Sequence, residues 1–220
     1  LGDVYKRQVM PDPKFVLAID TATAELVVGV AKRGEDGAVT VLAESAQATR
    51  AHNELLVPTV EATLQEAGVT YADLDAVVVG CGPGPFTGLR VGMASASAFA
   101  QALKIPVYGV VTHDATGLTV DTPSCLVVTD ARRREVYWAH YERGHRVAGP
   151  GVCAPSAVPV DSVDVLSCPE QLRDQLTVTA GEVTYLGPRT AGLIAAADFD
   201  APPAPLVPLY LRRPDAVPPK

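Results

Sequence analysis

Short runs of apolar residues separated by turn signals predict three strands at the start of the chain. The runs cover residues 15–19, 26–31 and 39–43, and a turn at residues 34–37, flanked by glycines, separates the last two. Apolar runs of this length, bounded by glycine and polar residues, are typical of β-strands. The short connections between them favour an antiparallel meander.

Two helices and two further strands are predicted next. Apolar side chains recur at helical spacing between residues 53 and 67, and Gly68 ends that helix. After a strand at residues 76–79, a loop rich in glycine and proline leads into a second helix from about Thr87 to Leu103. A strand at residues 107–111 follows this helix.

The second half of the chain opens in the same way as the first. The run at residues 125–129 ends at Asp130, as the run at residues 15–19 ends at Asp20, and in each half a second apolar strand begins a few residues later. A repeated module of this kind indicates internal duplication. The order of elements predicts an α/β protein of the actin/Hsp70-like ATPase superfamily, built from a duplicated ribonuclease-H-like module with the second copy reduced.

Four regions are expected along the chain. They are a leader outside the fold at residues 1–14, a first subdomain at 15–112, a second, smaller subdomain at 113–200, and a proline-rich tail at 201–220. The leader resembles a tag or fusion remnant at residues 1–10, because its sequence fits no element that follows. The tail contains seven prolines and is expected to run extended over the surface.

Composition excludes several classes of protein. The net charge of −7 argues against a chain that binds nucleic acid by itself, and the one basic run, Arg132 to Arg134, is interpreted as a solvated turn. The four cysteines form no CxxC pair, so they predict neither a zinc site nor a redox motif, and reduced thiols are consistent with the cytoplasm. No apolar run approaches the roughly 18 residues of a membrane span.

The loop at residues 80–88 has two interpretations. A loop between a strand and a helix often binds phosphate through free amides and the helix dipole. The dinucleotide pattern GxGxxG nearly fits from Gly82, but Thr87 replaces the third glycine, and Pro83 and Pro85 remove two amide donors. The favoured alternative is a rigid turn with Thr87 as the helix N-cap. The residues that a vestigial nucleotide site would use are Asp20, Thr21, Thr23, Gly82, Gly84 and Thr87.

No catalytic or metal-binding residues are predicted. In the turn after the first strand, Ala22 stands where phosphotransferases of this architecture usually have glycine, so a hydrogen-bonded turn at Asp20 is favoured over a phosphate loop. His52 is followed four residues later by Leu56 rather than a second histidine, which leaves no pair of metal ligands on one helix face. The patterns GxSxG and HExxH are absent from the sequence.

Small residues recur at every fourth position along the second helix. A row without side-chain bulk lets another backbone approach closely. The sequence leaves two explanations open: tight packing on the chain's own sheet or first helix, or a docking face for a partner. The row consists of Gly84, Gly88, Gly92, Ala96 and Ala100.

Four segments of the chain resemble the TsaB (YeaZ) family, and the resemblance extends from about residue 15 to the end. The most specific is the GPGxFTGLR run, in which this chain has Pro85 where the family usually has serine. The segments are Leu17–Thr23, Gly82–Gly92, Asp130–Tyr137 and Pro208–Arg213.

The resemblance implies a degenerate paralogue of TsaD, the catalytic subunit, whose two metal-binding histidines correspond to His52 and Leu56 here. It therefore implies a non-catalytic scaffold that dimerises with TsaD and works beside the P-loop ATPase subunit TsaE. Such a complex transfers a threonylcarbamoyl group to the adenosine next to the anticodon of ANN-reading tRNAs. The alternative functions are a peptidase or an ATP-dependent phosphotransferase of the actin-like superfamily.

The resemblance also implies which groups the chain would bind. It would contact tRNA only through the complex and no membrane, and it would hold no cofactor of its own, while ATP or ADP at the interface with partner subunits is left open. Self-association of the free chain as a homodimer is also left open. The docking face is expected on the two long helices of the first half, at Leu55, Leu56, Thr59, Gly84, Gly88, Val91, Gly92, Ala96 and Ala100.

The absence of a ligand pair at His52 and Leu56 gives the first testable prediction. Elemental analysis of the chain, purified without chelators, should find no stoichiometric zinc or iron, because one imidazole alone cannot hold either ion. One equivalent of either metal would contradict this prediction.

Overall fold

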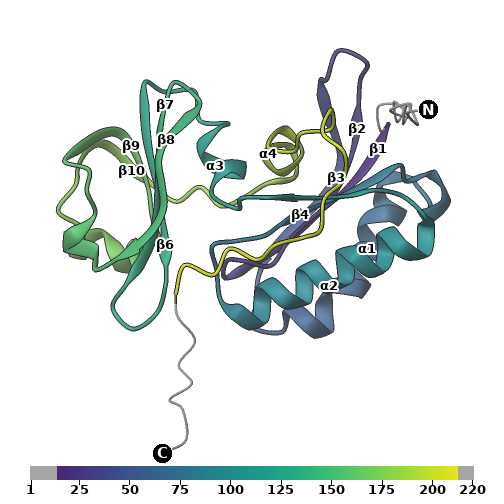
Figure 1. Cartoon of the computed structure of the whole chain (residues 1–220), viewed down its shortest axis with the longest axis horizontal. Helices are drawn as coiled ribbons and strands as arrows, with labels where there is room; N and C mark the ends of the chain where they lie inside the picture. The colour runs from purple at the N-terminus through teal and green to yellow at the C-terminus, as the bar shows by residue number, and fades with distance from the viewer. Residues whose placement is uncertain (1–13, 213–220) are drawn as a thin grey trace, which may run out of the picture.

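The computed structural model describes residues 14–212, which form two mixed α/β modules side by side (Figure 1). The predicted leader, apart from Lys14, and the end of the predicted tail lie outside the described residues. No helix within the described part of the chain is both long enough and apolar enough to cross a membrane.

The first module is a sheet of five strands with two long helices. An antiparallel meander supplies three strands, and the remaining two run parallel to the first of them after helical crossovers, in the order β3-β2-β1-β4-β5. The elements are β1 (Phe15–Asp20), β2 (Glu25–Arg33), β3 (Val39–Ala48), α1 (His52–Ala67), a 3-10 turn (Tyr71–Asp73), β4 (Ala76–Gly80), α2 (Phe86–Leu103) and β5 (Val107–Val110).

The second module repeats this topology. Its order is β10-β9-β6-β7-β8, so that, counted from its own first strand, each sheet has the order 3-2-1-4-5. The duplicated ribonuclease-H-like fold of the actin-like superfamily is therefore confirmed. The elements are α3 (Asp114–Gly117), β6 (Ser124–Asp130), β7 (Val136–Glu142), β8 (His145–Cys153), β9 (Ser162–Ser167), β10 (Thr179–Thr184), and 3-10 turns at Pro155–Ala157 and Glu170–Gln175.

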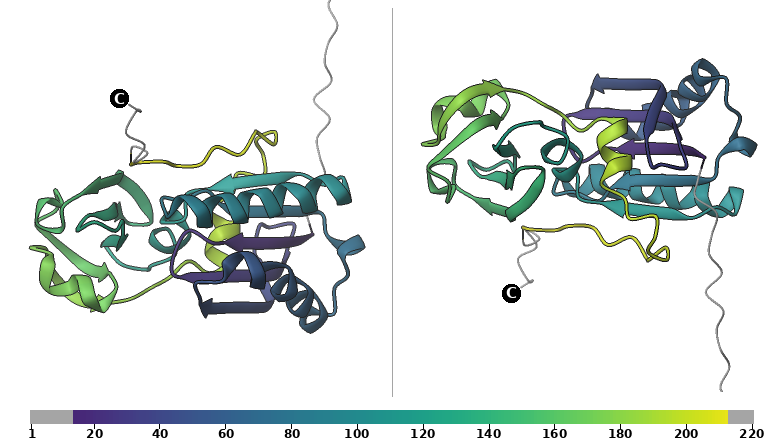
Figure 2. Two further views of the ribbon diagram at one scale, coloured as in Figure 1. Left: turned by 90° about the horizontal axis from the view of Figure 1, so that it is seen from below. Right: turned by 90° about the horizontal axis from the view of Figure 1, so that it is seen from above.

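Helices cover both faces of the first sheet (Figure 2). Alternate residues of β1 point to opposite faces, so Leu17 and Ile19 pack with α1 and α2, whereas Val16 and Ala18 pack with the last helix, α4 (Thr190–Ala195). Although α4 follows the second sheet in sequence, its side chains Leu193 and Ile194 belong to the core of the first. The chain therefore returns to its starting module to complete it.

The described part of the tail, residues 201–212, contains no helix or strand. It runs beside the edge of the first sheet and ends at the second module (Figure 1). The Leu209 N–H donates to the Cys81 carbonyl at 2.8 Å, and the Arg212 guanidinium donates to the Ala131 carbonyl at 3.1 Å. The tail is thus attached to both modules.

The start of α2 differs from the prediction. The N-cap is Pro85, with an extended conformation of φ −61° and ψ 134°, and the helix begins at Phe86. Thr87 therefore lies inside the first turn with an exposed side chain, and its prediction as N-cap was wrong. The proline ring fixes φ near −65°, which lets Pro85 end the extended loop and enter the helix directly.

Candidate functional site

The row of small residues on α2 faces the chain's own first sheet. A side chain at Gly84 would meet the backbone of Ala22, one at Gly88 the carbonyl of Thr21, and one at Gly92 the Thr21 hydroxyl. That hydroxyl donates to the Gly88 carbonyl at 2.8 Å. The glycines therefore let α2 lie directly against the turn that follows β1.

Most residues predicted to contact a partner are consequently internal. Burial contradicts a docking face at six of these positions, where tight internal packing describes the row, and at the three half-buried positions the docking face stays a prediction. The physical reason is that the glycines leave no side chain between the backbone at these positions and the β1 turn. Leu56, Thr59, Gly84, Gly92, Ala96 and Ala100 are buried, and Leu55, Gly88 and Val91 are half-buried.

The outer face of α2 is smooth and uncharged. Between Arg90 and Lys104 the helix carries no charged residue. Its exposed side chains recur at helical spacing and are small or neutral. They are Ala94, Ser97, Ala98, Gln101 and Ala102, and we call them the outer stripe.

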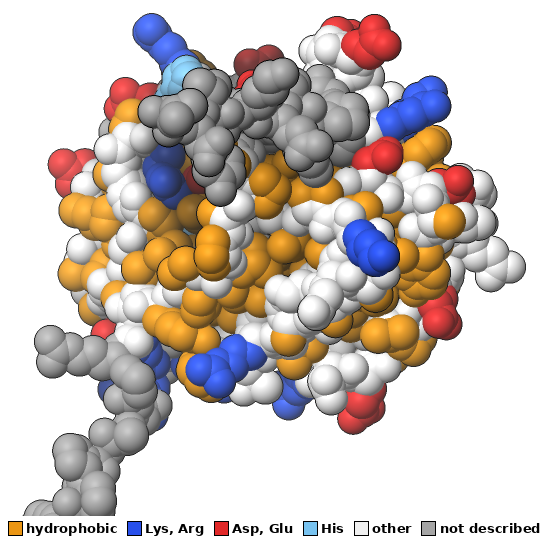
Figure 3. All heavy atoms as spheres, turned by 45° about the vertical axis from the view of Figure 1, so that its right-hand side comes forward, with side chains coloured by type: hydrophobic (Ala, Val, Ile, Leu, Met, Phe, Trp, Pro, Cys, Tyr) orange, Lys and Arg blue, Asp and Glu red, His pale blue; other side chains and the backbone are white. Residues whose placement is uncertain are grey.

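Helix α1 presents an exposed valine beside this helix, Val57 at 45% exposure. Figure 3 shows one side of the molecule, on which hydrophobic and uncharged atoms cover much of the surface and charged side chains stand mainly toward the edges. Large uncharged areas of this kind mark interaction surfaces on soluble proteins. The sequence contained these residues, but both sides of α2 are made of small residues, so periodicity could not show which side faces out.

The turn after β1 is the polar centre of the first module. The Asp20 carboxylate, which is fully buried, accepts hydrogen bonds from the Thr112 hydroxyl at 2.7 Å and the Ala22 N–H at 2.8 Å. Thr112 in turn accepts from the Gly82 N–H at 3.2 Å, which ties the loop at residues 80–88 to the ends of β1 and β5. Burial raises the pKa of Asp20 to about 6, although the two hydrogen bonds oppose the shift.

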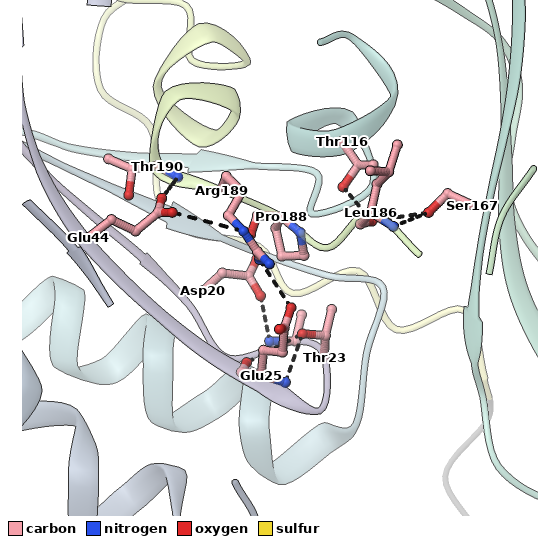
Figure 4. A network of polar contacts seen from close by, with 11 residues as sticks. Asp20, Thr23, Glu25, Glu44, Thr116, Ser167, Leu186, Pro188, Arg189 and Thr190 are labelled. Atoms are coloured by element: carbon pink, nitrogen blue, oxygen red, sulfur yellow. Dashed lines mark hydrogen bonds and ion pairs between the residues drawn. The ribbon is translucent and has the colours of Figure 1, made fainter. Parts of the chain in front are cut away.

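A segment returning from the second module covers this turn (Figure 4). The Arg189 guanidinium pairs with Glu25 at 3.1 Å, and the Thr190 N–H donates to Glu44. Tyr185 lies beside Thr23 and Glu25, and burial is the main cause that raises the pKa of Tyr185 to about 12. The exposed fraction of Thr23 is only 9%.

The predicted nucleotide-site residues are thus mostly brought together but are enclosed. Asp20, Thr21, Gly82 and Gly84 are buried around the end of β1, Thr23 lies beneath the returning segment, and Thr87 stands apart on the surface of α2. Sequence reasoning missed Thr112 and Arg189. A signal existed for Thr112, because it follows β5, and the ends of parallel strands meet at one edge of a sheet.

Among the described residues, no group of three or more histidine, cysteine, aspartate or glutamate side chains is placed to hold a metal ion. Leu56 is a core residue with 1% exposure, so its side chain packs in the interior, and position 56 supplies no second metal ligand beside His52.

The fold and the site define a class: an actin-like protein with two ribonuclease-H-like modules, in which the turn that follows the first strand is closed by the chain itself. The family model described as TsaD, tRNA N6-adenosine threonylcarbamoyltransferase, matches residues 41–195.

Similar sequences and a similar solved structure identify the family within this class. A tRNA threonylcarbamoyladenosine biosynthesis protein, TsaB of Escherichia coli K12, is 30% identical over 176 residues, or 78% of this chain and 70% of that protein. An uncharacterized protein of Mycobacterium tuberculosis is 54% identical over 207 residues, or 92% of this chain and 94% of that protein. The structure of YeaZ from Pseudomonas aeruginosa aligns with a TM-score of 0.68 and 26% identity, covering 83% of this chain and 90% of YeaZ. The chain belongs to the TsaB (YeaZ) family.

The glycine row predicts that Gly92→Leu destabilises the isolated chain. The added side chain would displace Thr21 from Gly88, and overpacking of this kind costs about 1–3 kcal/mol in the free energy of unfolding. Urea denaturation would measure the loss. The matched control is Ala94→Leu on the outer stripe, which should stay within about 0.5 kcal/mol of the parent chain. Equal stability of the two variants would refute the inward orientation of Gly92.

The buried carboxylate predicts a pH dependence of stability. Its folded-state pKa of about 6 lies above the value of 3.8 for a free aspartate, so the folded state binds the proton more tightly. The contribution of Asp20 to stability is therefore fully present below the unfolded pKa and is lost as the pH rises through about 6. A shift of this size corresponds to a few kcal/mol at about 1.4 kcal/mol per unit.

Asp20→Asn cannot ionise and should lack this dependence. We expect the stability of the variant, measured relative to the parent by urea denaturation, to rise between pH 4 and pH 7. A relative stability that falls over the same range would show that the carboxylate is favoured in its charged form.

Proposed function

We propose that the chain is the non-catalytic partner subunit of the complex that makes threonylcarbamoyladenosine in tRNA. In this proposal it docks on the catalytic subunit TsaD through the outer face of α1 and α2, beside the ATPase subunit TsaE. The complex transfers a threonylcarbamoyl group to the adenosine next to the anticodon of ANN-reading tRNAs, and this chain meets tRNA only within the complex. The role in threonylcarbamoyladenosine biosynthesis is supported by the name of the Escherichia coli relative.

The observation that carries the docking proposal is the outer stripe of α2. Small neutral side chains spaced along one exposed helix face let a helix of a partner pack at the usual 8–10 Å or closer. A second copy of the chain could use the same face when the partner is absent, which would give a homodimer. Both assemblies would cover the stripe.

Two features favour a non-catalytic role over a catalytic one. The turn at the end of β1, where actin-like enzymes meet the phosphates of a nucleotide, is buried beneath the segment that carries Tyr185 and Arg189. The buried Asp20 hydrogen-bonds Thr112 and backbone rather than facing a cleft. A nucleotide in the working complex would then bind at the interface with a partner, not in this turn.

The two alternative functions can be tested directly. A peptidase or an ATP-dependent phosphotransferase would act as the pure chain, without a partner. Hydrolysis of ATP with Mg²⁺, or of a peptide mixture, by the chain alone would refute the proposed role.

The outer stripe predicts the effect of a bulky charge. Ala98→Arg should weaken co-elution with the catalytic subunit by a factor of about 30 or more, because a block near the centre of an interface costs upwards of about 2 kcal/mol. Threonylcarbamoyladenosine in the tRNA of cells with this variant as the sole copy should fall accordingly, as measured by mass spectrometry of digested tRNA.

The matched controls separate docking from folding. Ala98→Ser should keep both co-elution and modification, and the melting temperature of Ala98→Arg alone should equal that of the parent. Normal co-elution of Ala98→Arg would place the docking face elsewhere. If the parent chain and Ala98→Arg both co-elute normally with the catalytic subunit, but neither strain contains threonylcarbamoyladenosine in its tRNA, the proposed role in threonylcarbamoyladenosine biosynthesis would be refuted instead.

A further inference from the structure

The turn between β6 and β7 is the counterpart, in the second module, of the buried turn after β1. In each, an aspartate side chain accepts from the N–H two residues later: Asp20 from Ala22 at 2.8 Å, and Asp130 from Arg132 at 2.7 Å. The first turn is enclosed, whereas the second is exposed. The two duplicated turns share this hydrogen bond but have diverged in what they expose to solvent.

The exposed turn carries three consecutive arginines in an unfavourable backbone conformation. Arg132, Arg133 and Arg134 have φ values of 61°, 52° and 65°, in the left-handed region that side chains with a Cβ avoid. Glycine or asparagine would occupy these positions at lower cost. Residues held in sparsely populated conformations concentrate at functional sites. The turn is therefore a candidate binding site for a ligand of the three arginine side chains.

The tail extends this basic turn into a longer surface. Arg212 donates to the Ala131 carbonyl at 3.1 Å and pairs with Glu135 at 3.3 Å, so the tail is held against the turn. Two residues earlier, Tyr210 stacks on Phe86 at the start of α2, with the ring centroids 5.2 Å apart.

A fifth arginine completes this surface. The Arg90 guanidinium lies 4.2 Å from the centroid of the Phe86 ring, and its Nε donates to the Tyr210 hydroxyl at 3.1 Å. Phe86 and Tyr210 remain 52% and 41% exposed. We call the set the basic–aromatic strip: Phe86, Arg90, Arg132, Arg133, Arg134, Tyr210 and Arg212.

The strip lies next to the proposed docking face. Figure 1 shows the connection from β6 to β7 and the end of the described tail at the lower side of the second module, the side on which α1 and α2 cover the first sheet. Phe86 and Arg90 belong to the first turns of α2 itself. A molecule bound along the strip would therefore reach a partner docked on α1 and α2.

We propose that this strip binds the RNA substrate of the complex, with backbone phosphates on the arginines and an unpaired base against Phe86 or Tyr210. Exposed arginines supply the charge that phosphates require, and exposed aromatic rings beside them are the combination that single-stranded RNA uses. An acidic protein segment would need the charges but not the rings. The inference rests on the proposed function, because the RNA is the tRNA of that complex.

The strip alone is too small to hold RNA. The chain has a net charge of −7, and Asp130 and Glu135 lie within the same turn. We therefore expect the isolated chain to bind tRNA no more tightly than the non-specific range of about 10⁻⁴ to 10⁻⁶ M, with the strip adding to the binding by the whole complex.

The test uses the complex with the catalytic subunit and, as a probe, an unmodified transcript of an ANN-reading tRNA. Replacing Arg132, Arg133 and Arg134 together by glutamine should weaken binding at least tenfold and reduce the salt slope of log K by about 1 for each arginine that meets a phosphate. Phe86→Ala should weaken binding while leaving the salt slope unchanged, since stacking releases no counterions.

The matched control is Arg143→Gln. Arg143 is also an exposed arginine with positive φ, 47°, but it lies at the opposite end of β7. It should bind tRNA like the parent complex. The triple change to lysine should keep the salt slope, and melting temperatures of all variants should show that each is folded.

Three results would overturn the inference. They are an unchanged salt slope in the triple glutamine variant, an equal effect of Arg143→Gln, or a loss confined to ADP binding or to co-elution, which would make the strip a nucleotide or protein contact. If the parent complex fails to form or to bind the transcript, the proposed function fails first and the inference with it.

Discussion

The packing of α2 against the turn after β1 is the constraint on which the rest of the first module depends. Gly84 and Gly88 lie against the backbone of Ala22 and Thr21, Gly92 lies against the Thr21 side chain, and none of the three positions has space for a larger residue. This contact closes the loop over Asp20, and the hydrogen bonds from Thr112 and Ala22 satisfy the buried carboxylate. With its thinnest side used internally, the helix can offer only its other side to a partner.

The same contact covers one side of the turn after β1. A turn that must admit a phosphate needs an open face, and here the face is occupied by α2 on one side and by the returning segment with Arg189 on the other. The duplicated turn in the second module keeps the aspartate-to-backbone hydrogen bond but stays exposed. Duplication therefore left one turn as a structural element and the other as a surface that can acquire a new ligand.

Much of the fold could be predicted from the sequence because β1, β2 and β4 of the first module are nearly continuous apolar runs, buried on both faces. β8 and β9 were missed, since β8 contains two glycines and a proline, which are typical of turns, and β9 mixes buried and exposed positions. The orientation of α2 was not predictable from periodicity, because its buried and exposed residues are equally small. Arg189 could not be found as a partner of the β1 turn, because it lies 164 residues from Glu25 in sequence, whereas the position of Thr112 after a parallel strand did offer a signal.

The tail has a mechanical consequence for the two modules. Two domains that are joined by two connecting segments can still rotate about the axis that passes through both segments, so a pair of crossovers can act as a hinge. Here the chain crosses between the modules through α3 and again through the segment before Arg189, and the tail adds a third fastening where Arg212 meets Ala131 and Glu135. Because of this third connection, we expect rotation of one module against the other to require that the bonds of Arg212 to Ala131 and Glu135 break.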